Sequence, residues 1–493
     1  MLLRFLKTNW KIILILVIGL FFRLYKYDEL FMYGHDQDLA AWVVKDIVID
    51  KHLRLIGQET STQGIFIGGL FYYLQIPFYL LARMDTIGAT FMGALLGLLY
   101  IVGIYSIIKR VFSDKAAIIA ALIYSISYYF IFNDREIVPT QPVVFWGMAL
   151  FWALSEIIAG KVKKGLIICA ILFALVWHLN FALILPLPLV LVALYLSGKK
   201  IKITEVLMAT GLFLILSLPL FYFEFRHSFL QSEALVASLS TNQYDIVSGW
   251  EKITRTYHLI AKNYFSIFLP DLNHIKYEHV MFLIIILFIY LFYKLKKYRK
   301  LFTLLLVWFI TYFVFFSLYS KRLSEYYLNG IQFIPIIIFS LILTEALKNK
   351  RLKNYFLLVF LILISISINR FITFPMNKNG YVEKKAIISE IKKDAEGHGY
   401  PCIAISFITK PGYELGYRYV FWLANMHVNR PDSLSPVYTI VFPLNEKLFP
   451  AGKTFGALGL IYPDYPRYTK EGIEKSCSGQ NSNLTDPMFG FTK

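Results

Sequence analysis

Charged residues are scarce in this chain. Lys, Arg, Asp and Glu together make up 17% of its 493 residues, whereas 57% are hydrophobic and 17% aromatic. A soluble globular protein carries about 25% charged residues, so the composition excludes an ordinary soluble domain. Apolar runs of about 20 residues recur along most of the chain, which predicts an α-helical polytopic membrane protein.

Acidic residues are the rarer of the two charged classes, 32 against 50 basic ones, and the net charge is +18. The basic residues gather in short loops between apolar runs rather than on one face of a domain. This positive-inside pattern argues against nucleic-acid binding and assigns the basic loops to the cytoplasmic side. These loops are "KRVFSDK" (109–115), "KVKK" (161–164), "KKIK" (199–202), "KLKKYRK" (294–300) and "KNKRLK" (348–353).

The basic loops also constrain the number of membrane crossings. Between Lys11 and Lys109 the chain must cross an even number of times, yet three apolar stretches lie there, 12–25, 64–82 and 86–108. The middle stretch contains a glutamine and a proline, and it suits an interfacial or re-entrant helix better than a span. Residues 26–85 are therefore expected to form one long extracytoplasmic loop.

About eleven membrane-spanning helices result, with the N-terminus in the cytoplasm of a bacterial-type plasma membrane and the C-terminus outside. Residues 1–373 are expected to form the transmembrane domain, and 374–493 a small extracytoplasmic α/β domain with a helix over 383–395 and strands over 401–408, 437–442 and 455–462. The expected spans are 12–25, 86–108, 116–132, 142–159, 165–178, 180–196, 203–223, 279–293, 301–319, 328–347 and 354–372.

Three cysteines occur in the chain. Cys169 lies within an expected span, where it is expected to pack as an ordinary apolar residue. Cys402 and Cys477 both fall in the C-terminal region. For these two, a disulfide and a pair of free thiols remain open alternatives.

The first outer loop carries an acidic cluster, "MYGHDQDLA" at 32–40. The following residues place their apolar side chains on one helical face, which predicts an amphipathic helix on the bilayer surface. Such a helix would hold Asp36 at headgroup depth, where a carboxylate can act as a general base. Asp38 is expected to cap this helix, and the alternative for Asp36 is an ordinary solvated side chain.

A second acidic loop, "NDREIVPTQP" (133–142), is expected on the same side of the membrane. Asp134 or Glu136 would supply a second carboxylate, and Arg135 would meet an anion; the alternative is a surface ion pair of little energetic value. His178 in "WHLN" is expected either to bind substrate or to be a hydrogen-bonded structural residue. If His35, Asp36, Glu136 and His178 converge, they offer ligands to a divalent cation.

Basic side chains in two further outer segments run against the positive-inside trend. They lie in "RTYHLIAKNYF" (255–265) and "SKRLSEYYLN" (320–329). Lys262 and Arg322 are the preferred phosphate ligands there, and the alternative is again a solvated loop. Tyr326 is expected to bind substrate or to belong to an interfacial aromatic belt.

Two stretches carry a resemblance to a known family: "FFRLYKYDELFMYGHDQDLAAWVVKDIV" and "LIGQETSTQGIFIGGLFYYL". Across residues 1–370 the chain resembles the GT-C membrane glycosyltransferases, in particular the family 39, protein O-mannosyltransferase-like and aminoarabinose-transferase-like enzymes. Asp36 takes the place of the family's first-loop catalytic aspartate, and Glu136 or Asp134 corresponds loosely to its second-loop acid. Many members have Asp-Glu in the first loop, whereas this chain has Asp-Gln.

The resemblance implies transfer of a sugar from a polyprenyl phosphate to an acceptor hydroxyl on a glycan, lipid or protein outside the cytoplasm. Phosphate is a good leaving group, so the reaction needs one base and cationic stabilisation of the phosphate. Tyr72 and Tyr73 in "GIFIGGLFYYL" are expected to line the groove for the lipid. A divalent cation is an open alternative as cofactor. A flippase of lipid-linked sugars is the alternative function, but transporters place charged sites within the membrane, whereas here polar groups gather at one membrane face, which favours an enzyme. A scaffold that presents the outer domain explains the membrane part poorly.

Overall fold

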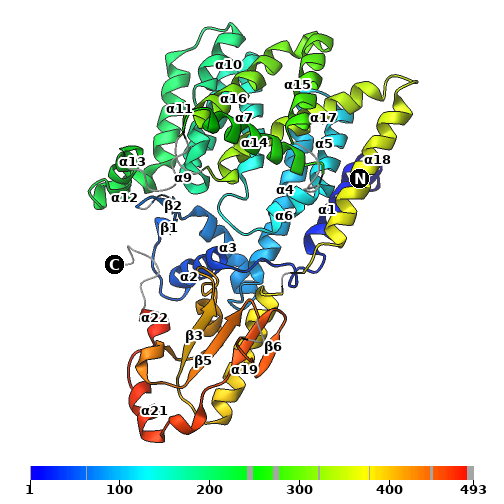
Figure 1. Ribbon diagram of the computed structural model, residues 1–493. Coiled ribbons are helices and arrows are strands. Elements are labelled where there is room, and N and C mark those ends of the chain that lie inside the picture. Colours follow the sequence, from blue (N-terminus) through cyan, green and yellow to red (C-terminus); the bar gives the residue numbers. More distant parts are fainter. Residues whose placement is uncertain are drawn as a thin grey trace.

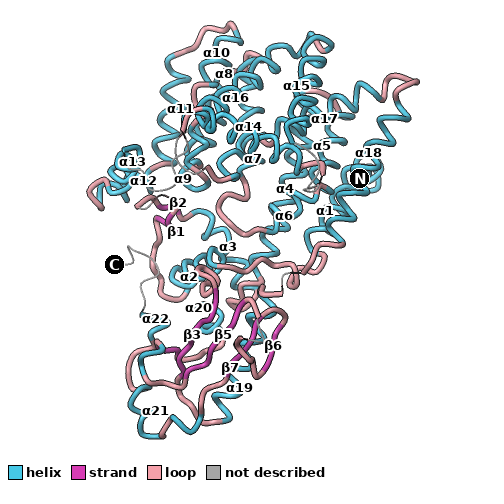
Figure 2. The backbone as a smooth tube through the Cα atoms, viewed as in Figure 1, coloured by secondary structure: helices cyan, strands magenta, loops and turns pink. Residues whose placement is uncertain are grey.

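The computed structural model describes residues 2–60, 62, 64–240, 248–269, 277–319, 323–376, 378–444 and 448–485. Most of the described residues lie in helices. They form a bundle, and a small sheet lies at one end of it, separated from the bundle by the segment that contains α2 and α3 (Figure 1). The tube view shows that the longer strands lie in this distal part (Figure 2).

The bundle consists of apolar helices that follow the expected spans. Each predicted range coincides with one helix or with two consecutive helices, and the basic loops interrupt them. The bundle elements are α1 (Leu2–Leu24), α4 (Gly88–Val111), α5 (Asp114–Ile126), α6 (Tyr128–Arg135), α7 (Val143–Ile158), α8 (Val162–Ala174), α9 (Val176–Leu179), η1 (Phe181–Ile184), α10 (Leu189–Ser197), α11 (Ile203–Leu216), α12 (Leu218–Arg226), α15 (Tyr277–Lys294), η2 (Lys296–Tyr298), α16 (Arg299–Leu318), η3 (Glu325–Ile331), α17 (Phe333–Ala346) and α18 (Lys353–Ile372).

Among the described residues, five helices are long and apolar enough to cross a membrane, or eight if each of three bent helix pairs is one span. The prediction of about eleven spans is therefore not confirmed. Bends of 62°, 54° and 45° divide α5 from α6, α11 from α12 and η3 from α17. The bend between α5 and α6 lies at Ser127. Its backbone is extended at the end of α5, and its hydroxyl donates a hydrogen bond to the Ile267 carbonyl at 2.6 Å.

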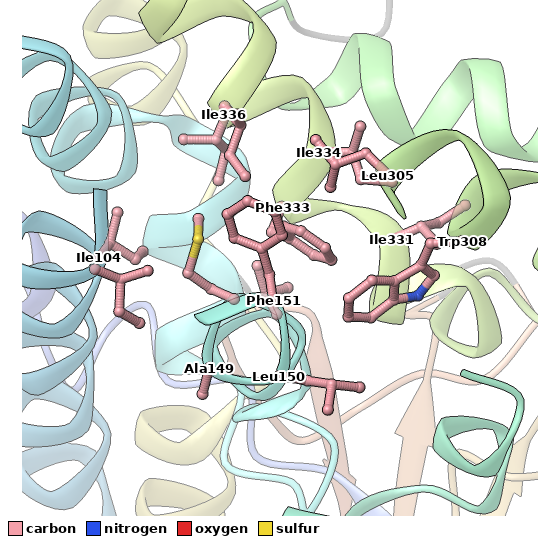
Figure 3. Close-up of a cluster of buried hydrophobic side chains, with 14 of the residues drawn as sticks. Ile104, Ala149, Leu150, Phe151, Leu305, Trp308, Ile331, Phe333, Ile334 and Ile336 are labelled. Carbon is pink, nitrogen blue, oxygen red and sulfur yellow. The ribbon is translucent and has the colours of Figure 1, made fainter. Parts of the chain in front are cut away.

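The bundle core is built around α7. Phe333 of α17 packs between Phe151 of α7, at a ring distance of 6.0 Å, and Trp308 of α16, at 4.8 Å. Figure 3 shows these rings with the aliphatic side chains of neighbouring helices around them. Helices that are apolar on all sides can be buried in this way, and α7 therefore fixes the relative positions of the surrounding helices.

The segment between α1 and α4 forms a short helix, a two-stranded antiparallel hairpin and a second helix. These are α2 (His35–Val48), β1 (Ile56–Glu59), β2 (Phe66–Gly68) and α3 (Leu70–Leu81). With 12 residues, α3 is about 18 Å long, shorter than the roughly 30 Å hydrocarbon core of a bilayer. Two further helices, α13 (Leu230–Ser240) and α14 (Trp250–Ser266), lie between α12 and α15.

The C-terminal region packs α19 (Tyr381–Gly397) against a five-stranded mixed sheet of order β4-β3-β5-β7-β6. The predicted strand over 455–462 contains β7, but Gly456, with a positive φ of 59°, turns the chain before it, so Phe455 belongs to the preceding strand β6. Cys402 and Cys477 form a disulfide. The remaining bounds are β3 (Ile403–Thr409), α20 (Arg418–Leu423), β4 (Val428–Asn429), η4 (Pro431–Ser433), β5 (Val437–Phe442), β6 (Lys453–Phe455), β7 (Leu458–Ile461), η5 (Tyr465–Arg467), α21 (Lys470–Cys477) and α22 (Ser482–Thr485).

Candidate active site

Asp36 lies in the first turn of α2 with an exposed side chain. The helix begins after Gly34, whose backbone N–H donates to Gln37 Oε1 at 2.9 Å. Gln37 Nε2 in turn lies 3.5 Å from the Ile137 carbonyl in the second acidic loop. Gln37 thus orders the start of α2 and brings it against that loop.

Asp38 does not cap α2, so the capping prediction is wrong. The helix begins three residues earlier, and Asp38 is buried within its first turns. Its Oδ1 accepts hydrogen bonds from the Tyr33 hydroxyl at 2.8 Å and from the Tyr419 backbone N–H at 3.1 Å. Burial raises the pKa of Asp38, and the hydrogen bonds from Tyr33 and Tyr419 only partly offset this effect.

Lys384 of α19 reaches the same place from the C-terminal region. Its buried ammonium donates to the carbonyls of Tyr33 at 3.1 Å and Leu415 at 3.4 Å, and it lies 4.5 Å from the centre of the Tyr417 ring. Burial lowers the pKa of Lys384 to about 8, and the Asp38 carboxyl opposes this shift. Together with a shared apolar cluster that includes Phe31, Ala40 and Tyr381, these contacts attach the C-terminal region to α2.

The β1–β2 hairpin supports Asp36 from the other side. Gln58 Nε2 donates a long hydrogen bond of 3.5 Å to Asp36 Oδ1, and the Tyr72 hydroxyl donates to Gln58 Oε1 at 3.3 Å. The Tyr72 hydroxyl also accepts from the Gln58 backbone N–H at 3.0 Å. Gly57 is required for this arrangement, because a Cβ there would lie 1.9 Å from the Tyr72 ring. Tyr72 therefore acts on Asp36 through Gln58.

Glu136 is the second-loop acid that lies close to Asp36. It follows the end of α6, and its side chain remains accessible to solvent although protein surrounds much of it. This partial burial raises the pKa of Glu136, and the Asp36 carboxylate raises it further. The two carboxyl groups thus differ, since Glu136 holds its proton to a higher pH than an isolated glutamic acid does.

Asp134 and Arg135 are both engaged inside the protein. Asp134 Oδ2 accepts from Arg23 Nε at 2.8 Å and from its terminal nitrogen at 2.5 Å, and Oδ1 accepts from the Tyr124 hydroxyl at 2.8 Å. Arg135 donates to the carbonyls of Phe22, Tyr25 and Lys26 at 3.0, 2.8 and 2.9 Å. The guanidinium thereby satisfies carbonyls at the C-terminus of α1, and no ion pair of Arg135 forms among the residues that the structure describes.

His178 and Tyr73 both contact the backbone of the first loop. The buried His178 side chain accepts from the Leu70 N–H at 3.4 Å, and a Cβ at Gly68 would lie 2.3 Å from its Nδ1. The Tyr73 hydroxyl bonds the N–H and the carbonyl of Arg54, each at 3.0 Å. Both side chains hold the hairpin against α3 and α9.

The third predicted set lies around α14 and η3. Lys262 donates to Glu325 Oε1 at 2.8 Å, and the Tyr326 ring packs 4.5 Å from that of Tyr327. Arg322 lies outside the described residues. The Tyr129 hydroxyl accepts a hydrogen bond from Gln332 Nε2 at 2.6 Å.

In the described part of the chain, no group of three His, Cys, Asp or Glu side chains is arranged to hold a metal ion, and His35, Asp36 and Glu136 form none. Gln37, Gln58 and Tyr129 were not predicted. The only signal for Gln37 was its place beside Asp36, Gln58 lies within one of the two stretches that carry the family resemblance, and nothing marked Tyr129.

Comparisons with known proteins agree with this architecture. A family model described as dolichyl-phosphate-mannose-protein mannosyltransferase matches residues 69–223, which is less than half of the chain. No curated protein sequence matches. The chain is similar in structure to ArnT from Cupriavidus metallidurans bound to undecaprenyl phosphate, with TM-score 0.57, 11% identity, and coverage of 92% of this chain and 98% of that one.

The apo state of the same ArnT gives TM-score 0.59 and 11% identity over 94% of this chain and 99% of that one. Identity this low speaks for the fold alone, over nearly the whole length of both chains. The expected GT-C fold, helical in the membrane with a small C-terminal sheet region, is therefore confirmed.

Proposed function

Starting from a GT-C membrane glycosyltransferase fold, we propose that this chain transfers a sugar from a polyprenyl-phosphate donor to an acceptor hydroxyl, with Asp36 as the base. The observation that carries the proposal is the position of Asp36. It is an accessible carboxylate that forms no ion pair among the described residues, it is oriented by Gln58, and it is near enough to the Glu136 carboxyl group to raise the pKa of that group.

In the proposed reaction, the Asp36 carboxylate removes the proton from the acceptor hydroxyl. The oxygen then forms a bond to the anomeric carbon from the face opposite the phosphate. The bond between that carbon and the phosphate oxygen breaks, and polyprenyl phosphate leaves with the electron pair. The configuration at the anomeric carbon inverts, and Asp36 returns its proton to water.

Glu136 is the proposed assisting acid, because burial and the Asp36 carboxylate both raise its pKa and so favour its protonated form, which can donate a hydrogen bond to the acceptor or the phosphate. Lys262 is the proposed cation for the phosphate, together with Arg322. The similar ArnT structure contains undecaprenyl phosphate, which supports a lipid phosphate as the leaving group. We further propose that this face of the membrane is extracytoplasmic, because the basic loops lie at the other ends of the helices.

The test uses the full-length protein in detergent with radiolabelled polyprenyl-phosphate sugars and a membrane extract as the acceptor source. Asp36→Asn keeps the size of the side chain and removes the base, so label transfer should fall about 10²- to 10⁴-fold. Asp50→Asn is the matched control, because Asp50 is an exposed carboxylate just after the same helix. Transfer by Asp36→Asn at the wild-type rate would refute the proposal.

A further inference from the structure

A groove of about 670 Å³ lies at the opposite end of α8 from the first loop. The C-terminal end of α8 continues into α9, which contacts β2, so its N-terminal end faces away from Asp36. The groove lies between the end of α7, the α7–α8 turn and the first turn of α11. Its volume is within the range of about 300–1,000 Å³ that ligand sites occupy. The residues that define it include Trp152, Lys161, Lys163, Lys164, Ile167 and Glu205.

Positive charge exceeds negative charge around this groove. The buried Glu156 carboxylate lies 2.5 Å from Arg110, 3.4 Å from Lys161 and 3.4 Å from Lys164. One carboxylate thus faces three cations. Lys163 adds a fourth, and it forms no ion pair in the part of the chain that the structure describes.

Three lysines and one carboxylate, that of Glu205, line the groove itself, and Lys199 lies beside the lining residue Gly160, so cations are in excess. The N-terminus of α8, which begins at Val162, adds partial positive charge at the same place. An anion in the groove would balance this excess.

The groove continues into an apolar surface toward the middle of the membrane. Ile167 and Ile168 line its inner part. Beyond them on α8, Ile171 is 40% exposed, and on the adjacent α11 Leu207 and Met208 are 62% and 45% exposed. At the entrance, the Trp152 ring lies 4.8 Å from the Lys164 ammonium. A ligand that fits both parts has an anionic head and an apolar tail.

We propose that this groove binds the phosphate headgroup of an anionic phospholipid from the adjacent leaflet, with an acyl chain along α8 and α11. Basic pockets between helices at the cytoplasmic surface favour anionic lipids, because several cations act on one phosphate at close range. The site takes no part in sugar transfer, and the proposal is independent of Asp36.

The test measures lipid binding by the full-length protein in neutral detergent by native mass spectrometry, with phosphatidylglycerol and phosphatidylcholine as probes. The wild type should retain one phosphatidylglycerol molecule in preference to phosphatidylcholine. In Lys161→Gln/Lys163→Gln/Lys164→Gln the affinity should fall about tenfold or more. The matched control, Lys348→Gln/Lys350→Gln/Lys353→Gln, removes the same charge from another basic loop and should bind as the wild type does.

The single variant Lys163→Gln keeps the test decisive if the triple variant fails to fold, because Lys163 supports no ion pair in the described structure. A loss of affinity in this variant supports the groove. Equal losses of phosphatidylglycerol affinity in the triple variant and its control would show a general electrostatic attraction and overturn the proposal. An unchanged affinity in the triple variant would overturn it as well. Displacement of the lipid by millimolar inorganic phosphate would assign the site to a soluble anion and refute the phospholipid.

Discussion

The buried ion pair between Arg23 and Asp134 allows a test of whether Asp134 stabilises the fold or takes part in catalysis. Neither side chain is exposed. Asp134 accepts two hydrogen bonds from Arg23 and one from Tyr124, and Arg23 also donates to the carbonyls of Gly19 and Ser125 at 3.1 and 3.3 Å. The Asp134 carboxylate thus balances the buried charge of the Arg23 guanidinium.

Removing one partner of such a pair costs about 3–5 kcal/mol, because the other charge stays buried and uncompensated. Asp134→Asn should therefore destabilise the protein by about this amount. Arg23→Met should cost less, because an isolated carboxyl group can take up a proton and become neutral, whereas a guanidinium cannot lose one. The double variant Arg23→Met/Asp134→Leu removes both charges, and its stability should return to within about 1–2 kcal/mol of the wild type.

The assay is thermal unfolding of the purified variants in one detergent, combined with label transfer per folded molecule. The double variant should transfer sugar at a rate near that of the wild type if Asp134 only holds α6 against α1. The reasoning is refuted if Asp134→Asn melts with the wild type but has no activity, because Asp134 would then act in the chemistry. Gly97→Ala is an independent check, since a Cβ there would lie 2.2 Å from Arg23 Nε and should disturb the pair without removing it.

Three further predictions concern other groups. Transfer should decline as the pH rises through the raised pKa of Glu136, and Glu136→Gln, which always donates, should lack that alkaline decline in a pH–rate profile. The pKa of Lys384 is about 8 in the folded protein, whereas that of an unfolded lysine is about 10.4. The unfolded chain therefore binds more protons between these pH values, and the free energy of unfolding should rise with pH by about 3 kcal/mol. Lys384→Met should lack this rise in melting curves. Replacing Cys402 and Cys477 by serine should destabilise the C-terminal region by about 4 kcal/mol in unfolding titrations, because the disulfide closes a loop across a separation of 75 residues; equal stability of oxidised and reduced wild type would contradict this.

Much of the membrane architecture could be predicted from local properties of the sequence. Apolar runs and basic loops give the helices and their ends, and Pro77 and Gln75 favour an interfacial or re-entrant helix over a span for the stretch that contains α3. The spans could not be counted reliably, because the bends at Ser127 and Gln332 are accompanied by hydrogen bonds to Ile267 and Tyr129, which lie in other parts of the chain. Hydropathy does not record such contacts.

The candidate site shows the same limit. The sequence indicates that "NDRE" belongs to an acidic loop. It does not show which of the two acids, Asp134 or Glu136, is held in an ion pair, because this depends on the partner of each side chain. Asp134 meets Arg23 from 111 positions away, whereas Glu136 meets Asp36 from the first loop. Gln58 was missed because its hydrogen bond to Asp36 joins residues 22 positions apart. Spacing and composition do not record a contact of this kind.

The hydrogen bond from the Tyr419 amide to Asp38 sets an order of events during synthesis. The two residues are 381 positions apart. At about 5–20 residues per second, roughly 20–75 s pass between their emergence from the ribosome. Throughout that time α2, which carries Asp36, lacks the backbone donor and the Lys384 contacts that attach it to the C-terminal region. The first polar element to be made is thus among the last to be completed, so a chain truncated before α20 would insert into the membrane without a finished site.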